Sequence, residues 1–75
     1  MNHMEKERIA IPLRDARLAA GMTQQQLAKL SGVNYRQIQK VEAGEIKAGN
    51  MTASNLLAIA DALGVDPRRL ISDEG

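Results

Sequence analysis

Apolar residues recur at helical spacing along the chain, and glycine, proline and capping residues divide them into short segments. The first segment begins at Pro12, which suits the first turn of a helix because an N–H there has no partner inside the helix. It ends at Gly21, which can adopt the left-handed conformation that closes a helix. The pattern predicts a helix between these two residues.

A capping box begins the second predicted helix. The hydroxyl of Thr23 is expected to accept from the backbone N–H of Gln26, whose side chain reaches back to the Thr23 backbone. The helix then runs to about Leu30. We expect its apolar residues Leu27 and Ala28 to face inward, with Leu30 as a further candidate.

Residues 31–34 separate this helix from the third and are too few for anything but a tight turn. Gly32 can adopt a positive φ at little cost, and Asn34 is a capping residue. The third predicted helix extends from this cap through Ala43 to Gly44. Two helices joined by so short a turn, with glycine in it, form the signature of a helix-turn-helix, here over residues 23–43.

The third predicted helix has two chemically different faces. At about 100° per residue, Ile38, Val41 and Glu42 fall on one side, which must look into the domain. The opposite side carries polar or small residues: Arg36, Gln39, Lys40 and Ala43. Such a face can hydrogen-bond the edges of DNA bases, although any amphipathic surface helix also has a polar outer face.

Two further helices follow a looser segment that runs from Glu45 to Met51. Thr52 caps the fourth, which ends at Gly64, and residues 66–67 combine an aspartate cap with proline to open a short fifth helix. The prediction is an all-α, compact bundle of five short helices. It spans residues 11–71, between a flexible N-terminal segment (1–10) and a C-terminal tail (72–75).

Composition narrows the function. The 75 residues allow one domain with a modest core, and no apolar run approaches the roughly 20 residues of a membrane span. There is no cysteine and only one histidine, so a catalytic triad or a zinc site lacks its parts. We therefore expect a soluble cytoplasmic protein with no enzyme activity, metal, cofactor, membrane or small-molecule substrate.

Charge is unevenly distributed on a chain whose net charge is only +1. Five basic residues lie between positions 17 and 47 against two acidic ones, whereas the rest of the chain is acidic by two. A positive middle suits a phosphate-facing surface, but a solvated helix face would look the same.

The stretch from Leu13 to Val65 resembles the lambda-repressor-like helix-turn-helix family, also called the Cro/C1 or XRE type. The most specific matching pieces are GMTQQQLAKLSGV, the I..VEAG end of the third predicted helix and LLAIADALGV, in this order and spacing. The resemblance implies a fold of five helices and a function in transcriptional control, with a double-stranded DNA operator as the partner. It also implies a bacterial or phage-encoded protein.

The resemblance also implies which residues meet DNA. Gln24, at the start of the second helix, would contact a phosphate and position the protein. The groups implied to face the major groove are Asn34, Tyr35, Arg36 and Lys40, with Gln37 and Gln39 as further candidates. Tyr35 has a purely packing role as its alternative. Lys47 is a candidate backbone contact in a loop that is longer than in the compact members of the family.

Glu42 lies on the apolar side of its predicted helix, where a carboxylate needs a partner. The resemblance supplies one, because it implies a structural ion pair, buried or half-buried, between Glu42 and Arg17 of the first helix.

We expect a homodimer on a roughly palindromic operator, because one domain with so little net charge can neutralise few phosphates. The candidate dimerisation residues lie near the C-terminus: Leu63, Val65, Leu70 and Ile71. For the last two, the alternative is that they close the core over the first helix.

Two other functions stay open. In an antitoxin, the same DNA-binding domain also neutralises a toxin protein, and a small toxin gene beside this one would favour that hypothesis. A protein-interaction module could keep the fold without binding DNA, but the outward Arg36, Gln39 and Lys40 argue against it.

Overall fold

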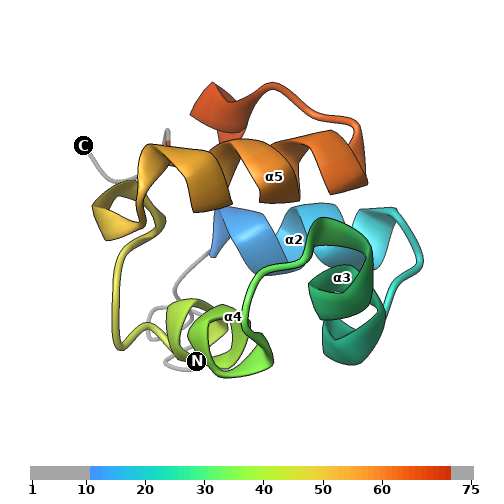
Figure 1. Cartoon of the computed structure of the whole chain (residues 1–75), viewed down its shortest axis with the longest axis horizontal. Helices are drawn as coiled ribbons and strands as arrows, with labels where there is room; N and C mark the ends of the chain where they lie inside the picture. The colour runs from blue at the N-terminus through green and yellow to red at the C-terminus, as the bar shows by residue number, and fades with distance from the viewer. Residues whose placement is uncertain (1–10, 72–75) are drawn as a thin grey trace, which may run out of the picture.

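The computed structural model describes residues 11–71, and the predictions for segments 1–10 and 72–75 lie outside these described residues. In the described part, helices follow one another without a strand (Figure 1). They are α2 (Pro12–Ala19), α3 (Gln24–Ser31), α4 (Tyr35–Glu42), the 3-10 helix η1 (Ala48–Asn50), α5 (Ala53–Leu63) and the 3-10 helix η2 (Pro67–Leu70).

The all-α prediction is confirmed, but residues 11–71 contain four α-helices where five helices were predicted. The segment expected to be a fifth helix is η2, in which the N–H of Arg69 donates to Asp66 O at 2.9 Å and that of Ile71 to Arg68 O at 3.3 Å. These are i to i+3 bonds, which a four-residue segment can form without completing an α-helical turn. The loop before α5 likewise contains η1, which was not predicted.

The capping box that was predicted at the start of α3 is present. The N–H of Gln26 donates to Thr23 Oγ1 at 3.0 Å, and the N–H of Thr23 donates to Gln26 Oε1 at 2.9 Å. The Thr52 hydroxyl caps α5 in the same way by accepting from the N–H of Asn55 at 3.1 Å. These bonds satisfy backbone donors that a helix leaves unpaired at its N-terminus, and so fix where each helix begins.

The core is aliphatic and draws one fully buried side chain from each of five elements. In chain order from α2 to η2, skipping η1, these are Leu13, Leu27, Ile38, Ile59 and Leu70. Each contributes about 2 kcal/mol by leaving water. Their even distribution means that no single pair of helices forms the core alone.

The burial of two side chains bears on predictions made from the sequence. Leu30, a candidate for the inward face of α3, is 62% exposed. Leu70, a candidate for the dimer surface, is 1% exposed and closes the core. This burial fits the alternative stated for Leu70, that it closes the core over the first helix, and its place on a dimer surface stays a prediction.

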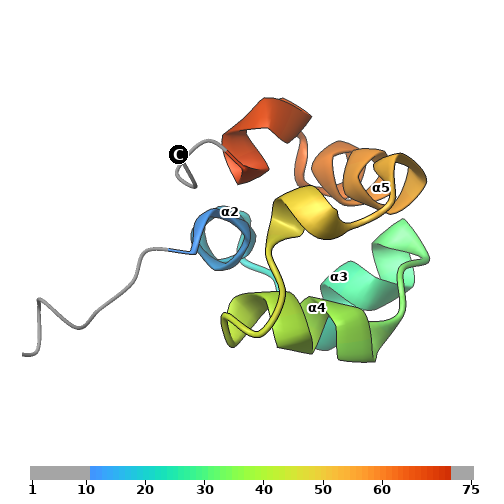
Figure 2. The same cartoon turned by 90° about the vertical axis from the view of Figure 1, so that its left-hand side faces the viewer.

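The arrangement places α3 and α4 together on one side of the molecule. Both views show them at the bottom and η2 at the top, with α2 and α5 between (Figures 1 and 2). α3 packs against both α4 and α5, while η2 packs against α2 and α5. The outer faces of α3 and α4 are therefore directed away from η2. No helix that the structure describes is long and apolar enough to cross a membrane.

Candidate nucleic-acid interface

The turn between α3 and α4 is short and fixed by its own hydrogen bonds. Gly32 ends α3 with a left-handed φ of 79°, and its N–H donates to Ala28 O at 2.8 Å. Val33 is buried, and Asn34 then caps α4 by accepting from the N–H of Arg36 at 2.7 Å. The turn thus holds the two helices as one helix-turn-helix unit.

Burial divides α4 into the two faces that the sequence predicts. Ile38, Val41 and Glu42 are buried, with exposed fractions of 0%, 3% and 7%. Most of the residues assigned to the major groove are exposed, on α4 or at its cap: Asn34, Tyr35, Arg36, Gln39 and Lys40. Gln37 is half-buried. The exposed set can donate hydrogen bonds to phosphates and to base edges.

Tyr35 and Gln39 form a pair one helical turn apart. Gln39 Nε2 donates to Tyr35 Oη at 3.1 Å, and the tyrosine is 37% exposed. Since the phenol accepts this bond, its own proton is left to be donated outward. Tyr35 is therefore a surface residue of α4 and no part of the core.

Gln24, the predicted phosphate contact, lies half-buried at the N-terminus of α3. Its Nε2 donates to Glu42 Oε1 at 3.0 Å, so the end of α4 holds the start of α3 through a side-chain bond. An amide nitrogen carries two hydrogens, and the second remains for another acceptor.

Glu42 and Arg17 form a bidentate ion pair across the interior. Arg17 Nε donates to Glu42 Oε2 at 2.7 Å and Arg17 Nη2 to Glu42 Oε1 at 2.8 Å. The side chains are 11% and 4% exposed, and Arg17 Nη1 also donates to Met22 O at 2.7 Å. The hydrogen bond to Glu42 raises the pKa of Arg17 above its usual value. The pair links α2 to α4 and fixes the carboxylate to which Gln24 binds.

Sequence reasoning missed one side chain at this surface. Asn55, in the first turn of α5, donates from Nδ2 to Gln37 Oε1 at 2.9 Å. Its place three residues after Thr52 marks it only as part of a helix start. Because the two amides are 18 positions apart, no local pattern could have paired them.

Lys47 is exposed and immediately precedes η1. The loop is anchored on both sides of it. The N–H of Glu45 donates to Lys40 O at 2.9 Å, and Ala48 and Met51 are buried at 4% and 7%. The lysine is therefore carried on a packed loop that directly follows α4.

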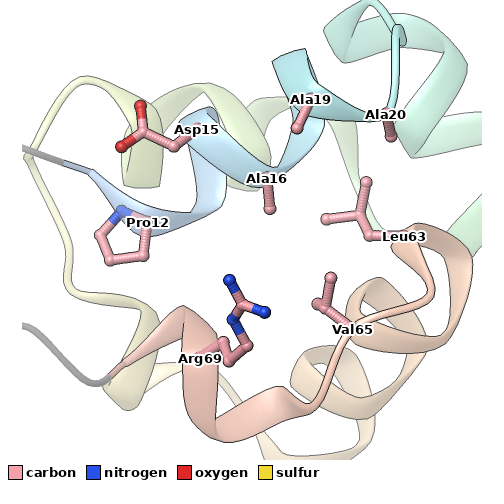
Figure 3. A pocket seen from close by; sticks show the side chains of 8 residues that line it. All are labelled: Pro12, Asp15, Ala16, Ala19, Ala20, Leu63, Val65 and Arg69. Carbon is pink, nitrogen blue, oxygen red and sulfur yellow. The ribbon is translucent and has the colours of Figure 1, made fainter.

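Two of the remaining dimer candidates line a groove between α2, the C-terminal end of α5 and η2. Leu63 and Val65 point into this groove of about 600 Å³, opposite Ala16 and Ala19 of α2 and its C-cap Ala20 (Figure 3). Pro12, Asp15 and Arg69 complete its lining. Ile71 is half-buried against the core.

The comparisons with known proteins agree with this geometry. The family model HTH_3, described as helix-turn-helix, matches residues 13–70. The solved structure of the restriction-modification controller protein C.AhdI from Aeromonas hydrophila is similar, with a TM-score of 0.69 and 38% sequence identity over 80% of this chain and 86% of that one. No curated protein matches this sequence. The chain belongs to the HTH_3 helix-turn-helix family, of the Cro/C1 and XRE type, and is a DNA-binding transcription regulator and not an enzyme.

Proposed function

We propose that the protein binds double-stranded DNA sequence-specifically by placing α4 in the major groove, and that it does so as a homodimer in the cytoplasm of a bacterium. The observation that supports this most is the exposed polar face of α4. The helix α4 directly follows the Gly32 turn, and its opposite face packs into the core through Ile38 and Val41. A recognition helix needs both a polar outer face and a rigid seat.

The residues divide into those that specify and those that position. Arg36, in the first turn of α4, is exposed and can donate to both O6 and N7 of guanine. Gln24 and Lys47 lie on either side of α4 in the chain and suit phosphates, which fix the register without carrying sequence information. Lys40 is exposed on α4, and its charge can serve either kind of contact.

Selection of bound sequences from a random pool of duplexes tests this proposal. The parent should select one motif, and Arg36→Ala should relax the preference at one base position and cost roughly 1–3 kcal/mol. Arg68→Ala is the matched control, since this arginine is exposed on η2, on the side away from α4. If Arg36→Ala selects the parent motif with unchanged affinity, α4 does not read DNA through Arg36 as proposed.

The homodimer would use the surface around Val65. Leu57 of α5 is 55% exposed. A second shallow hollow is lined in part by Leu57, Ala58, Val65 and Pro67. Joining two copies raises the effective concentration of the second α4, and two-fold symmetry matches half-sites about 34 Å apart.

Sedimentation with and without a selected duplex tests the dimer. Leu57→Asp should reduce the number of protein copies in the assembly, free or on DNA, from two to one. Leu18→Asp, which alters a similarly exposed leucine of α2 (58% against 55%), should not. One copy per duplex at saturation, on a motif without inverted symmetry, would contradict the dimer and leave DNA binding intact.

The likeness to C.AhdI, a restriction-modification controller protein, also supports a class of target genes. We propose that this regulator likewise controls restriction-modification genes. The selected motif should then occur upstream of neighbouring genes for a restriction enzyme and a methyltransferase. A neighbouring gene for a small toxin would instead favour the antitoxin hypothesis.

A further inference from the structure

A hydrogen bond between two side-chain amides joins the recognition helix to a residue outside the helix-turn-helix. Asn55 Nδ2, in the first turn of α5, donates to Gln37 Oε1, in the first turn of α4, at 2.9 Å. Both residues are half-buried. The bond therefore reaches the edge of the exposed face of α4, where the first-turn residues of a recognition helix meet base edges.

The direction of this bond follows from where Asn55 sits. Its own backbone N–H is capped by Thr52 Oγ1 at 3.1 Å, which fixes the first turn of α5. The first turn of a helix carries partial positive charge and so favours an oxygen near its unpaired N–H groups. The side-chain oxygen of Asn55 is therefore favoured on the side of the helix N–H groups, and its NH₂ group is the end directed at Gln37.

The bond changes what Gln37 can recognise. A glutamine that presents both ends of its amide reads adenine, since it donates to N7 and accepts from N6. The bond from Asn55 holds the Gln37 oxygen on the side of α5. That oxygen keeps a second lone pair, but the nitrogen is the end of the amide left to turn towards DNA. A donor alone suits base edges that offer only acceptors, namely N7 and O6 of guanine or O4 of thymine.

We propose that Asn55 is a specificity-setting positioning residue, which makes Gln37 a hydrogen-bond donor towards DNA and so turns its base preference away from adenine and cytosine. This inference rests on the proposed function, because it requires α4 to lie in the major groove. Asn55 itself need not touch DNA, and it acts by holding one end of the Gln37 amide.

Gln39 provides an internal comparison on the same helix. It donates through Nε2 to Tyr35 Oη, so its oxygen stays available and one of its two N–H groups does as well. Gln39 can still both donate and accept, and its preference does not depend on Asn55. A change at Asn55 should therefore alter the base position read by Gln37 and no other.

The test compares the motifs selected from a random duplex pool by the parent, Asn55→Asp, Asn55→Leu and Gln37→Ala. A carboxylate can only accept, so Asn55→Asp should reverse the Gln37 amide and present its oxygen to DNA. At one base position, the preference should then shift by about ten-fold from guanine or thymine towards adenine or cytosine. Gln37→Ala should identify that position by losing preference there.

Asn55→Leu covers the case in which the added charge weakens binding or folding. It removes the donor without adding an acceptor, so Gln37 is released to present both ends, and adenine should become tolerated at the same position. A merely structural role for Asn55 would lower affinity for all sequences alike and leave the relative base preferences unchanged.

The outcomes separate this inference from the function on which it rests. If the parent selects no motif, the proposed function fails. If the parent selects a motif but both Asn55 variants keep the parent preference at the Gln37 position, the inference is overturned and the function stands. The same holds if Gln37→Ala changes no base preference. In the free protein, the Asn55 side-chain NH₂ resonance should shift in Gln37→Ala, and an unchanged resonance would show that the bond is absent.

Discussion

Arg17→Ala would leave the buried carboxylate of Glu42 without its counter-charge. The guanidinium makes two short bonds to Glu42, at 2.7 and 2.8 Å, and one to Met22 O at 2.7 Å. With the Glu42 side chain 4% exposed, water cannot easily replace the lost donors. The bond from Gln24 Nε2 is the one side-chain donor that would remain to the carboxylate among the described residues.

The expected loss of stability follows from this geometry. Breaking a buried pair by removing one partner costs about 3–5 kcal/mol, because an uncompensated charge stays behind. The remaining Gln24 bond places this case near the lower end, at about 3 kcal/mol. A domain of this size has a free energy of unfolding of about 5–10 kcal/mol, so the variant would fold with a small margin. The melting temperature should fall by roughly 12–24 °C.

Thermal unfolding followed by far-ultraviolet circular dichroism measures this effect. Arg14→Ala is the control, since Arg14 lies on the same helix, is half-buried, and has no side-chain hydrogen bond or ion pair within residues 11–71. The double variant Arg17→Met, Glu42→Leu should recover much of the loss, because it removes both charges from the interior. Equal melting temperatures for Arg17→Ala and Arg14→Ala would refute the reasoning, as the pair would then contribute nothing.

Three further predictions concern DNA binding, the turn and pH. Gln24→Ala should weaken binding without changing the selected motif, since phosphate contacts position and do not specify, and a changed motif would contradict this. Gly32→Ala should lower the free energy of unfolding in urea by about 1–2 kcal/mol, because alanine is strained at the φ of 79°. An added Cβ would meet no atom within 4 Å, so no steric clash contributes. An unchanged urea midpoint would refute this strain. The Arg68 side chain and then its backbone N–H lower the pKa of Asp66 to about 2 from 3.8, so this carboxylate stabilises the fold above pH 4 and loses that effect as the pH falls towards 2. An NMR titration of Arg68→Ala should show the pKa returned towards its usual value, and a pKa still near 2 would contradict the role of Arg68.

The parts of the fold that depend on local chemistry could be predicted from the sequence. The Thr23 capping box, the Gly32 turn and the Asn34 cap each lie within a few neighbouring residues, and all three are present. The faces of α4 follow from helical periodicity alone, and burial confirms them.

The rest depends on packing between distant segments. Residues 67–70 form a 3-10 helix because their backbone N–H groups bond three residues back and not four. The aspartate cap and the proline are compatible with either pattern, so they do not distinguish the two. Leu70 and Ile71 are adjacent and equally apolar, and only the position of η2 over the core buries the first and leaves the second half-buried. The bond between Asn55 and Gln37 likewise exists because α5 passes beside α4.

The aliphatic core has a practical consequence for following this protein in solution. Tyr35 is the only tyrosine of the sequence, which contains no tryptophan or phenylalanine, and it lies on the surface of α4. Biosynthetic incorporation of a fluorinated tyrosine would therefore give a single fluorine resonance, located on the helix proposed to meet DNA. Because every fully buried side chain within residues 11–71 is aliphatic, this label would leave that interior chemically untouched, and one signal would report docking of α4 without any need for assignment.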